Sequence, residues 1–178
     1  MADEGATDGL DFWSFVELAE RRLAEEFGFP HRTATRLLLT LNRASAIVTY
    51  DLEAAVHRPR GLSWAGFRLL FVTWLAGPLE PGRAAALAGM TRAAVSNLSK
   101  SLVADGLLAR APGERDGRTV TLSLTEQGRK AMLEVFAAQN ARELEWTDAL
   151  TETEQRILIM LLDKLIEGRR RFDVRERS

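Results

Sequence analysis

The sequence predicts a mainly α-helical fold that carries one small β-hairpin. Three observations support this fold class. Apolar residues recur at helical spacing along most of the chain, whereas residues 107–111 and 119–124 are strand-like. Between these two stretches, residues 112–118 contain a proline, an aspartate and two glycines, which favour a turn. Because two short helices precede the hairpin, the order of elements is typical of a winged helix-turn-helix.

The first of the two short helices is predicted over residues 83–88. Pro81 stands just before it, where the fixed backbone angle of proline suits the start of a helix. Gly89 follows it and can adopt the left-handed conformation that commonly ends a helix. A tight turn at Gly89 would then lead into the second helix.

The second short helix, within residues 89–105, combines an apolar stripe with a polar face. Val95, Leu98 and Leu102 recur at helical spacing and are expected to face the core. The opposite side has no large apolar side chain, so the helix backbone could approach base edges while donors reach purines and phosphates. The expected DNA-binding residues of this segment are Thr91, Arg92, Ala93, Ser96, Asn97 and Lys100.

The hairpin is expected to form a wing. Its second strand would direct Val120, Leu122 and Leu124 inward, in alternation with threonine and serine. Its tip carries Arg115 and Arg118, and arginines beside a recognition helix can follow the DNA backbone into a narrow minor groove. The hairpin therefore predicts a second DNA contact.

The distribution of charge agrees with a DNA-binding middle segment. The whole chain has a net charge of -1. Residues 81–130 hold eight basic and four acidic residues, a balance of +4, so the remainder carries -5. Binding to a phosphate backbone depends on the charges at the interface rather than on the total, so this asymmetry favours double-stranded DNA as a partner.

The chain resembles the multiple antibiotic resistance regulator (MarR) family. The resemblance lies in LAGMTRAAVSNLSKSLVADGLLAR, in Asp116-x-Arg118 with Val120-x-Leu122-x-Leu124-Thr125, and in Gln127-Gly128-Arg129. It implies that Asp116 stabilises the wing by pairing with an arginine, and that Arg115 and Arg118 supply the minor-groove contact. It further implies a ligand-responsive transcriptional regulator that represses from an operator. One departure is Glu80-Pro81-Gly82, where the family more often has a Thr or Ser cap.

Both ends of the chain are predicted to be helical. Helices are expected from a Thr33 cap to about Val56, from a Thr125 cap to about Trp146, and from a capping box Thr151-x-x-Glu154 onward. The last helix has a wider apolar surface than one packing face requires. Its apolar residues are Ile157, Leu158, Met160, Leu161, Leu162, Leu165 and Ile166. The excess suggests that a partner helix covers it.

The resemblance gives this surface a role in assembly. It implies that the terminal helices of two subunits interlock into a two-fold homodimer, whose two recognition helices read a pseudo-palindromic operator. The expected organisation has three regions. Residues 1–60 hold an extra helix and a dimerisation helix, residues 61–128 the winged helix-turn-helix, and residues 129–178 the C-terminal dimerisation helices.

An additional amphipathic helix is predicted at residues 11–27. Its apolar side is expected to consist of Phe12, Phe15, Ala19, Leu23 and Phe27. This extra helix resembles a urate-responsive subgroup of the family, which uses a tryptophan on the extra helix, matched here by Trp13, together with an acidic residue on the helix that precedes the DNA-binding motif. Here the acidic position is Arg68, and a guanidinium pairs with planar anions. A carboxylate or phenolate effector is therefore expected in place of urate.

Two interpretations of the aromatic residues in 64–74 remain open. Trp64, Phe67, Phe71 and Trp74 repeat at three- and four-residue intervals, and such stripes usually fill a core. Alternatively, Trp64 and Phe71 line an apolar effector pocket with one charged anchor. The candidate effector-binding residues are Trp13, Trp64, Arg68 and Phe71.

Several other classes of function find no support in the sequence. The chain has no cysteine, which excludes disulfides and thiol-based redox sensing. Its two histidines are isolated, and no phosphate loop or nucleophile motif appears, so neither metal, cofactor, catalytic residue nor enzymatic activity is expected. No membrane span or signal peptide is evident, which favours the cytoplasm. The alternative function is a winged-helix module for protein association, which would carry apolar anchors on the recognition face.

Overall fold

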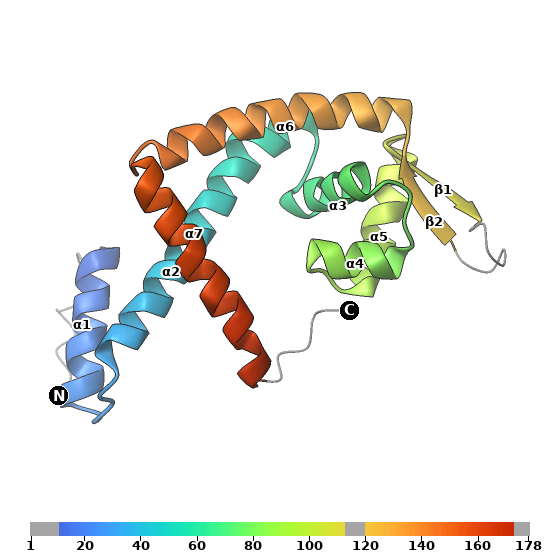
Figure 1. The fold of residues 1–178 in the computed structure, drawn as a ribbon. Coiled ribbons are helices and arrows are strands. Elements are labelled where there is room, and N and C mark those ends of the chain that lie inside the picture. Colours follow the sequence, from blue (N-terminus) through green and yellow to red (C-terminus); the bar gives the residue numbers. More distant parts are fainter. Residues whose placement is uncertain (1–10, 113–119, 173–178) are drawn as a thin grey trace, which may run out of the picture. The chain divides into compact units, whose positions relative to one another are not determined.

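The structure is a computed structural model that describes residues 11–112 and 120–172 (Figure 1). The chain divides into two compact units, Met1–Tyr50 and Asp51–Ser178. The predicted fold class is confirmed, because the described residues are mainly helical and their two strands form one antiparallel hairpin. The division into three functional regions stays a prediction.

The N-terminal unit begins with helix α1, Phe12–Glu25. The carboxylate of Asp11 caps this helix by accepting a hydrogen bond from the Ser14 amide at 2.8 Å. The predicted additional helix is therefore confirmed, although it ends before Phe27. Its apolar face differs from the expectation.

The buried line of α1 passes through Val16, which is 2% exposed. Phe15 and Phe27, which were expected on this line, are 50% and 63% exposed. The packed face of α1 therefore runs through Phe12 and Val16, which are four residues apart and lie on the same side of the helix. Phe12 contacts α2 on this side, because the guanidinium of Arg43 lies over its ring at 5.5 Å from the ring centroid. Aromatic side chains alone were therefore a poor guide to the packed side of this helix.

Helix α2, Arg32–Leu52, begins earlier than predicted. Thr33 was expected to cap it but lies within the first turn. The Arg32 amide donates to the Pro30 carbonyl at 3.0 Å, and the His31 carbonyl accepts from the Thr35 amide at 3.1 Å. Helical hydrogen bonding therefore starts before Thr33, whose hydroxyl is not needed as a cap.

The far end of α2 winds differently from an α-helix. After Leu52 the chain forms a π-helical turn η1, Glu53–His57, and a 3₁₀ turn η2, Arg58–Arg60. The expected α-helix to Val56 is thus wrong over its last turn. A π-turn adds one residue to the repeat, and it directs His57 into the interior of the second unit, where the side chain is fully buried.

In the second unit, three helices and the hairpin follow η2 in sequence. These elements are α3 Trp64–Ala76, α4 Pro81–Ala88, α5 Arg92–Ala104, β1 Leu108–Pro112 and β2 Val120–Leu124 (Figure 1). Helix α3 is apolar nearly all round and contacts α4, α5, α6 and β2. It is therefore the central helix, against which the other elements of this region pack.

The hairpin is short and only partly buried. Its antiparallel register pairs Leu108 with Leu124 and Pro112 with Val120. Pro112 was expected in the turn but ends β1, a position where its missing amide costs no ladder hydrogen bond. Of the three side chains expected to point inward, Leu122 is fully buried, whereas Val120 and Leu124 are half-buried. The base of the wing is packed more tightly than its outer part.

Two long helices follow the hairpin. Helix α6, Glu126–Thr147, is capped by the Thr125 hydroxyl, and α7, Glu152–Gly168, starts at a complete capping box of Thr151 and Glu154. Both predicted starts are confirmed. Helix α7 contains no buried residue, and a 3₁₀ turn η3, Arg169–Phe172, follows it. Within the described residues, no helix has the length and apolar character that a membrane span requires.

Candidate nucleic-acid interface

Helix α5 presents a polar face, as the sequence predicts. The Thr91 hydroxyl caps the helix by accepting from the Ala94 amide at 3.1 Å. Of the six expected DNA-binding residues of this segment, Ser96 is half-buried and five are exposed, namely Thr91, Arg92, Ala93, Asn97 and Lys100. One side of a single rigid helix therefore carries small residues and hydrogen-bond donors together.

The opposite side of α5 holds one surprise. Val95 and Leu102 are buried as expected, but the position between them in the packed line is Ser99, and Leu98 lies half-buried at its edge. The Ser99 hydroxyl donates to the Ser96 carbonyl at 3.0 Å, which satisfies this polar group inside the core. The spacings of four and three residues between Val95, Ser99 and Leu102 are typical of a helical packing face. Because serine is polar, the sequence does not indicate that position 99 belongs to this face.

The turn before α5 is a complete Schellman motif. Gly89 has φ +60°, and its amide donates to the Ala86 carbonyl at 3.2 Å. The Met90 amide donates to the Ala85 carbonyl at 2.8 Å. Glycine is needed at this left-handed position, so the predicted end of α4 is confirmed.

The side chain of Arg92 runs beside the first turn of α4. A Cβ atom at Gly82 would lie 3.7 Å from the Arg92 Nε. The small residue at this position leaves room for the guanidinium beside the amino-terminal end of α4. The Glu80-Pro81-Gly82 sequence provides no side-chain cap there, and α4 still forms, with Pro81 as its first residue.

The tip of the wing lies outside the described residues. This applies to Arg115, Asp116 and Arg118, whose roles stay predictions. The base of the wing is defined by Leu79, whose amide and carbonyl exchange hydrogen bonds with the backbone of Leu122 at 3.0 and 2.9 Å. These bonds attach the hairpin to the segment between α3 and α4.

The wing and α5 meet the start of α6 at a close backbone contact. A Cβ atom at Gly128 would lie 2.0 Å from the Leu107 carbonyl oxygen, so only glycine fits. The Thr125 hydroxyl donates to the Gly106 carbonyl at 2.6 Å and also caps α6. The turn that follows α5 is therefore connected directly to the start of α6. In the sequence, Gly128 is recognisable only as part of Gln127-Gly128-Arg129, which does not predict this close contact.

The aromatic residues of α3 form a stacked array. Phe67 stacks on His57 with ring centroids 4.5 Å apart and on Phe71 at 5.6 Å. Phe71 in turn stacks on Phe136 of α6 at 5.4 Å, and Trp64 stacks on Phe67 at 5.9 Å. The core interpretation accounts for these contacts, although Trp64 and Phe71 are half-buried and keep part of their rings accessible.

Arg68 does not occupy the position expected of a ligand anchor. Its guanidinium donates from Nη2 to the carbonyl oxygen of Ala88, at the end of α4. The expectation that Arg68 joins Trp64 and Phe71 around an apolar cleft is therefore corrected, because the arginine points towards the helix-turn-helix. Trp13, the fourth expected ligand-binding residue, belongs to the N-terminal unit and is 60% exposed.

His57 is a fully buried polar residue for which the sequence predicts no role. Its Nε2 lies 2.8 Å from the Gln139 Oε1, and the Gln139 amide nitrogen donates to Glu143 at 2.7 Å. Since the glutamine oxygen can only accept, Nε2 carries the proton, and among the described residues the buried acceptor Nδ1 has no hydrogen-bond partner. Burial lowers the pKa of His57 and favours this neutral form.

A second link joins the end of α2 to α6 on the surface. The carboxylate of Asp51 accepts two hydrogen bonds from the Arg142 guanidinium, at 2.7 and 2.8 Å, and one from the Trp146 indole at 2.7 Å. These bonds lower the pKa of Asp51 to about 2. The segment from Asp51 to His57 is thus held on α6 at two points.

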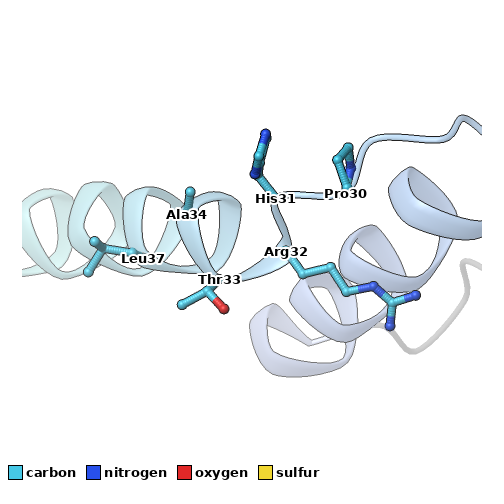
Figure 2. A pocket seen from close by; sticks show the side chains of 6 residues that line it. All are labelled: Pro30, His31, Arg32, Thr33, Ala34 and Leu37. Carbon is cyan, nitrogen blue, oxygen red and sulfur yellow. The ribbon is translucent and has the colours of Figure 1, made fainter.

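A shallow hollow surrounds the start of α2, and Figure 2 shows its lining side chains pointing to different sides of the chain. Arg32 is already paired with Glu25 at 3.5 Å. These groups do not converge on a ligand. Within the described ranges, no cluster of His, Cys, Asp or Glu is suited to hold a metal ion.

Comparison with known proteins places this geometry among transcriptional regulators. The model of the MarR family matches residues 60–119. An uncharacterized HTH-type transcriptional regulator of Bacillus subtilis, YwaE, is 31% identical over 135 residues, which cover 76% of this chain and 79% of that protein.

Solved structures agree with the sequence comparison. A MarR family regulator from Silicibacter pomeroyi has a TM-score of 0.68 and 26% identity, covering 80% of this chain and 95% of the other. BpsR of Bordetella bronchiseptica, whose DNA binding is regulated by 6-hydroxynicotinic acid, has a TM-score of 0.67 at 22% identity, covering 73% of this chain and 98% of its own.

Proposed function

This chain belongs to the MarR family of transcriptional regulators, and we propose that it acts as a homodimeric repressor that a small aromatic or anionic ligand releases from its operator. The chain is a regulator and not an enzyme. The observation that carries the proposal is the exposed polar face of α5, capped at Thr91 and backed by the buried Val95. A rigid helix with small residues and donors on one side suits the major groove.

We infer separate tasks for the residues of this face. Arg92 and Asn97, which are exposed, are proposed to donate to purine edges, and the exposed Lys100 is proposed to contact a phosphate. Ala93 and Ser96 are small, which allows the backbone to approach the bases. The wing arginines, Arg115 and Arg118 in the sequence, are proposed to enter the adjacent minor groove, with Asp116 stabilising the wing.

The test is a selection of DNA from a random-sequence library, followed by titration of the enriched duplex and a scrambled duplex of equal length. We expect Arg92→Ala and Asn97→Ala each to reduce the preference for the enriched duplex about tenfold. Asn140→Ala, an exposed asparagine on α6, is the matched control and should bind as the wild type does. Unchanged preference in both α5 variants would reject this recognition face.

The wing is tested by the salt dependence of binding. Arg115→Ala and Arg118→Ala should each weaken binding and reduce the slope of log affinity against log salt by about one unit. An unaltered slope would contradict a phosphate or minor-groove contact by these arginines. If the wild type binds both duplexes equally and weakly, the protein-association function replaces the operator-binding one.

The dimer part of the proposal rests on α7. Its large apolar side chains are substantially exposed in the single chain; they include Ile157, Leu158, Leu161 and Leu165. Apolar surface of this extent is typical of a protein interface. A two-fold dimer would place two α5 helices about 34 to 36 Å apart, which corresponds to one turn of DNA and to a pseudo-palindromic operator.

The ligand part of the proposal draws on BpsR, in which 6-hydroxynicotinic acid regulates DNA binding. We infer an aromatic effector for this chain, with Trp64 and Phe71 as its contacts, because both rings are partly accessible. Effector and operator would oppose each other by linkage, each lowering the affinity for the other. The test is titration of the protein–DNA complex with aromatic carboxylates and phenols. Failure of all of them to change DNA affinity would reject the ligand response.

Repression is tested by a promoter reporter that carries the enriched duplex. We expect expression of the chain to lower the reporter signal and an effective ligand to restore it. A signal that rises on expression of the chain would identify an activator instead.

A further inference from the structure

Arg68 makes a contact that neither the core nor a ligand pocket explains. It lies on α3 and is half-buried, and its Nη2 donates to the carbonyl oxygen of Ala88, the last residue of α4. The Schellman motif takes up the carbonyls of Ala85 and Ala86 but leaves that of Ala88 free. Ala88 is only 4% exposed, so a side-chain donor is needed there.

The guanidinium is also suited to this place by its charge. The carboxyl-terminal end of a helix carries partial negative charge, which a cation stabilises. A Cβ atom at Gly89 would lie 3.0 Å from the Arg68 Nη2, so the arginine packs directly on the left-handed glycine of the turn. It therefore contacts the turn through both its hydrogen bond and its packing.

This turn determines the direction of the recognition helix. Only Gly89 and Met90 separate Ala88, which ends α4, from Thr91, which caps α5. A change in the backbone at Ala88 or Gly89 would therefore rotate α5 relative to α3. Helix α3 is in turn packed on α6, where Phe71 and Phe136 stack.

We propose that Arg68 is a positioning residue for DNA recognition, which holds the turn between α4 and α5 so that the polar face of α5 meets the groove in one orientation. The inference rests on the proposed function of α5. Arg68 acts through the backbone of Ala88 and Gly89 and does not itself contact a phosphate. It links α3, and through it α6, to the recognition helix.

The experiment compares Arg68→Gln and Arg68→Lys with a matched control, Arg60→Gln. Arg60 makes the same type of bond, from its guanidinium to the Val56 carbonyl at 2.8 Å, but outside the helix-turn-helix. Each full-length variant is titrated with the duplex enriched by the wild type and with its scrambled counterpart, over a range of salt. Hydrogen exchange of residues 89–95 is measured in parallel, with the strands β1 and β2 as an internal reference for global stability.

We expect Arg68→Gln to lose about tenfold in affinity for the enriched duplex, the scale for removing a charged hydrogen bond that maintains the competent orientation. Its affinity for the scrambled duplex and its salt slope should match the wild type, because no phosphate contact is lost. Exchange at residues 89–95 should become faster while exchange in β1 and β2 does not. Arg68→Lys should recover part of the affinity, and Arg60→Gln should behave as the wild type.

Two results would overturn the proposal. One is an unchanged affinity ratio with unchanged exchange at residues 89–95. The other is an equal loss for both duplexes with a smaller salt slope, which would make Arg68 a phosphate contact. If Arg68→Gln does not fold, the ratio of the affinities for the enriched and the scrambled duplex is measured with Arg68→Lys, and the same criteria apply to that variant. If the wild type enriches no duplex, the proposed function fails and the exchange comparison alone decides whether Arg68 holds the turn.

Discussion

Helices α5 and α7 present their apolar side chains in opposite ways. In α5, Val95 and Leu102 are buried by other parts of the same chain. In α7 no residue is buried, and Leu161 is 48% exposed. Both helices show apolar residues at helical spacing, so the pattern indicates a packing face in each case. It does not indicate whether the covering surface comes from the same chain or from another.

The largest effect is expected where the chain is packed against itself most closely. Gly128→Ala would place a methyl group 2.0 Å from the Leu107 carbonyl oxygen, so the start of α6 must separate from the end of α5. We expect a loss of about 4 kcal/mol in unfolding free energy, or failure to fold. Chemical denaturation measures it. The control is Gly168→Ala at the end of α7, where nothing lies within 4 Å and stability should be unchanged or slightly higher.

The next effect tests the buried base of the wing. Leu122→Ala removes a side chain with no exposed surface and leaves a cavity, so we expect a loss of about 3 kcal/mol in unfolding free energy. Leu161→Ala on α7 makes the same chemical change on an exposed surface. At a protein concentration low enough for single chains, its unfolding free energy should equal that of the wild type. Equal losses in both variants would show that α7 packs within its own chain.

A smaller effect is expected from a charge on α7. Leu161→Glu should leave the single chain folded but weaken self-association about 30-fold, because a carboxylate would be desolvated in the interface. Sedimentation equilibrium measures the dissociation constant. Glu167→Gln, an exposed change on the same helix, is the control. Self-association that is unaffected by Leu161→Glu would assign the dimer interface elsewhere.

The smallest effect concerns the exposed link between Asp51 and Arg142. The pKa of Asp51 is lowered from 3.8 to about 2 by the hydrogen bonds from Arg142 and Trp146. This link therefore stabilises the fold above pH 3.8, and its contribution is lost as the pH falls to about 2. Asp51→Asn should flatten the dependence of unfolding free energy on pH in this range. Asp163→Asn on α7 is the control, and the same flattening in both would exclude a specific role for the ion pair.

Local chemistry was predictable at the ends of helices. Thr125 and Thr151 each cap a helix at the start that the sequence predicts, because a cap hydroxyl bonds to an amide three residues later. Gly89 was predictable for the same reason, since a left-handed turn depends on the residue itself. The polar face of α5 also follows from sequence spacing within one helix.

The partners of long-range contacts were not predictable in this way. The candidate effector site grouped Arg68 with Trp64 and Phe71 because all three share α3, yet the guanidinium reaches Ala88, 20 residues away. In the sequence His57 has no neighbouring metal-ligand or catalytic partner, yet in the structure it forms a hydrogen bond with Gln139, which is 82 residues away along the chain. Such pairs depend on how helices cross, and spacing within one helix carries no information about the crossing.

The sequence by itself therefore determined the fold class, the starts of α6 and α7, and the polar face of α5. These features depend on hydrogen bonds and periodicities that span a few residues. Only the tertiary structure decided that Arg68 donates to the Ala88 carbonyl and that Gly128 lies against Leu107. The physical reason is that both contacts join elements whose distance in space is set by the packing of the whole unit.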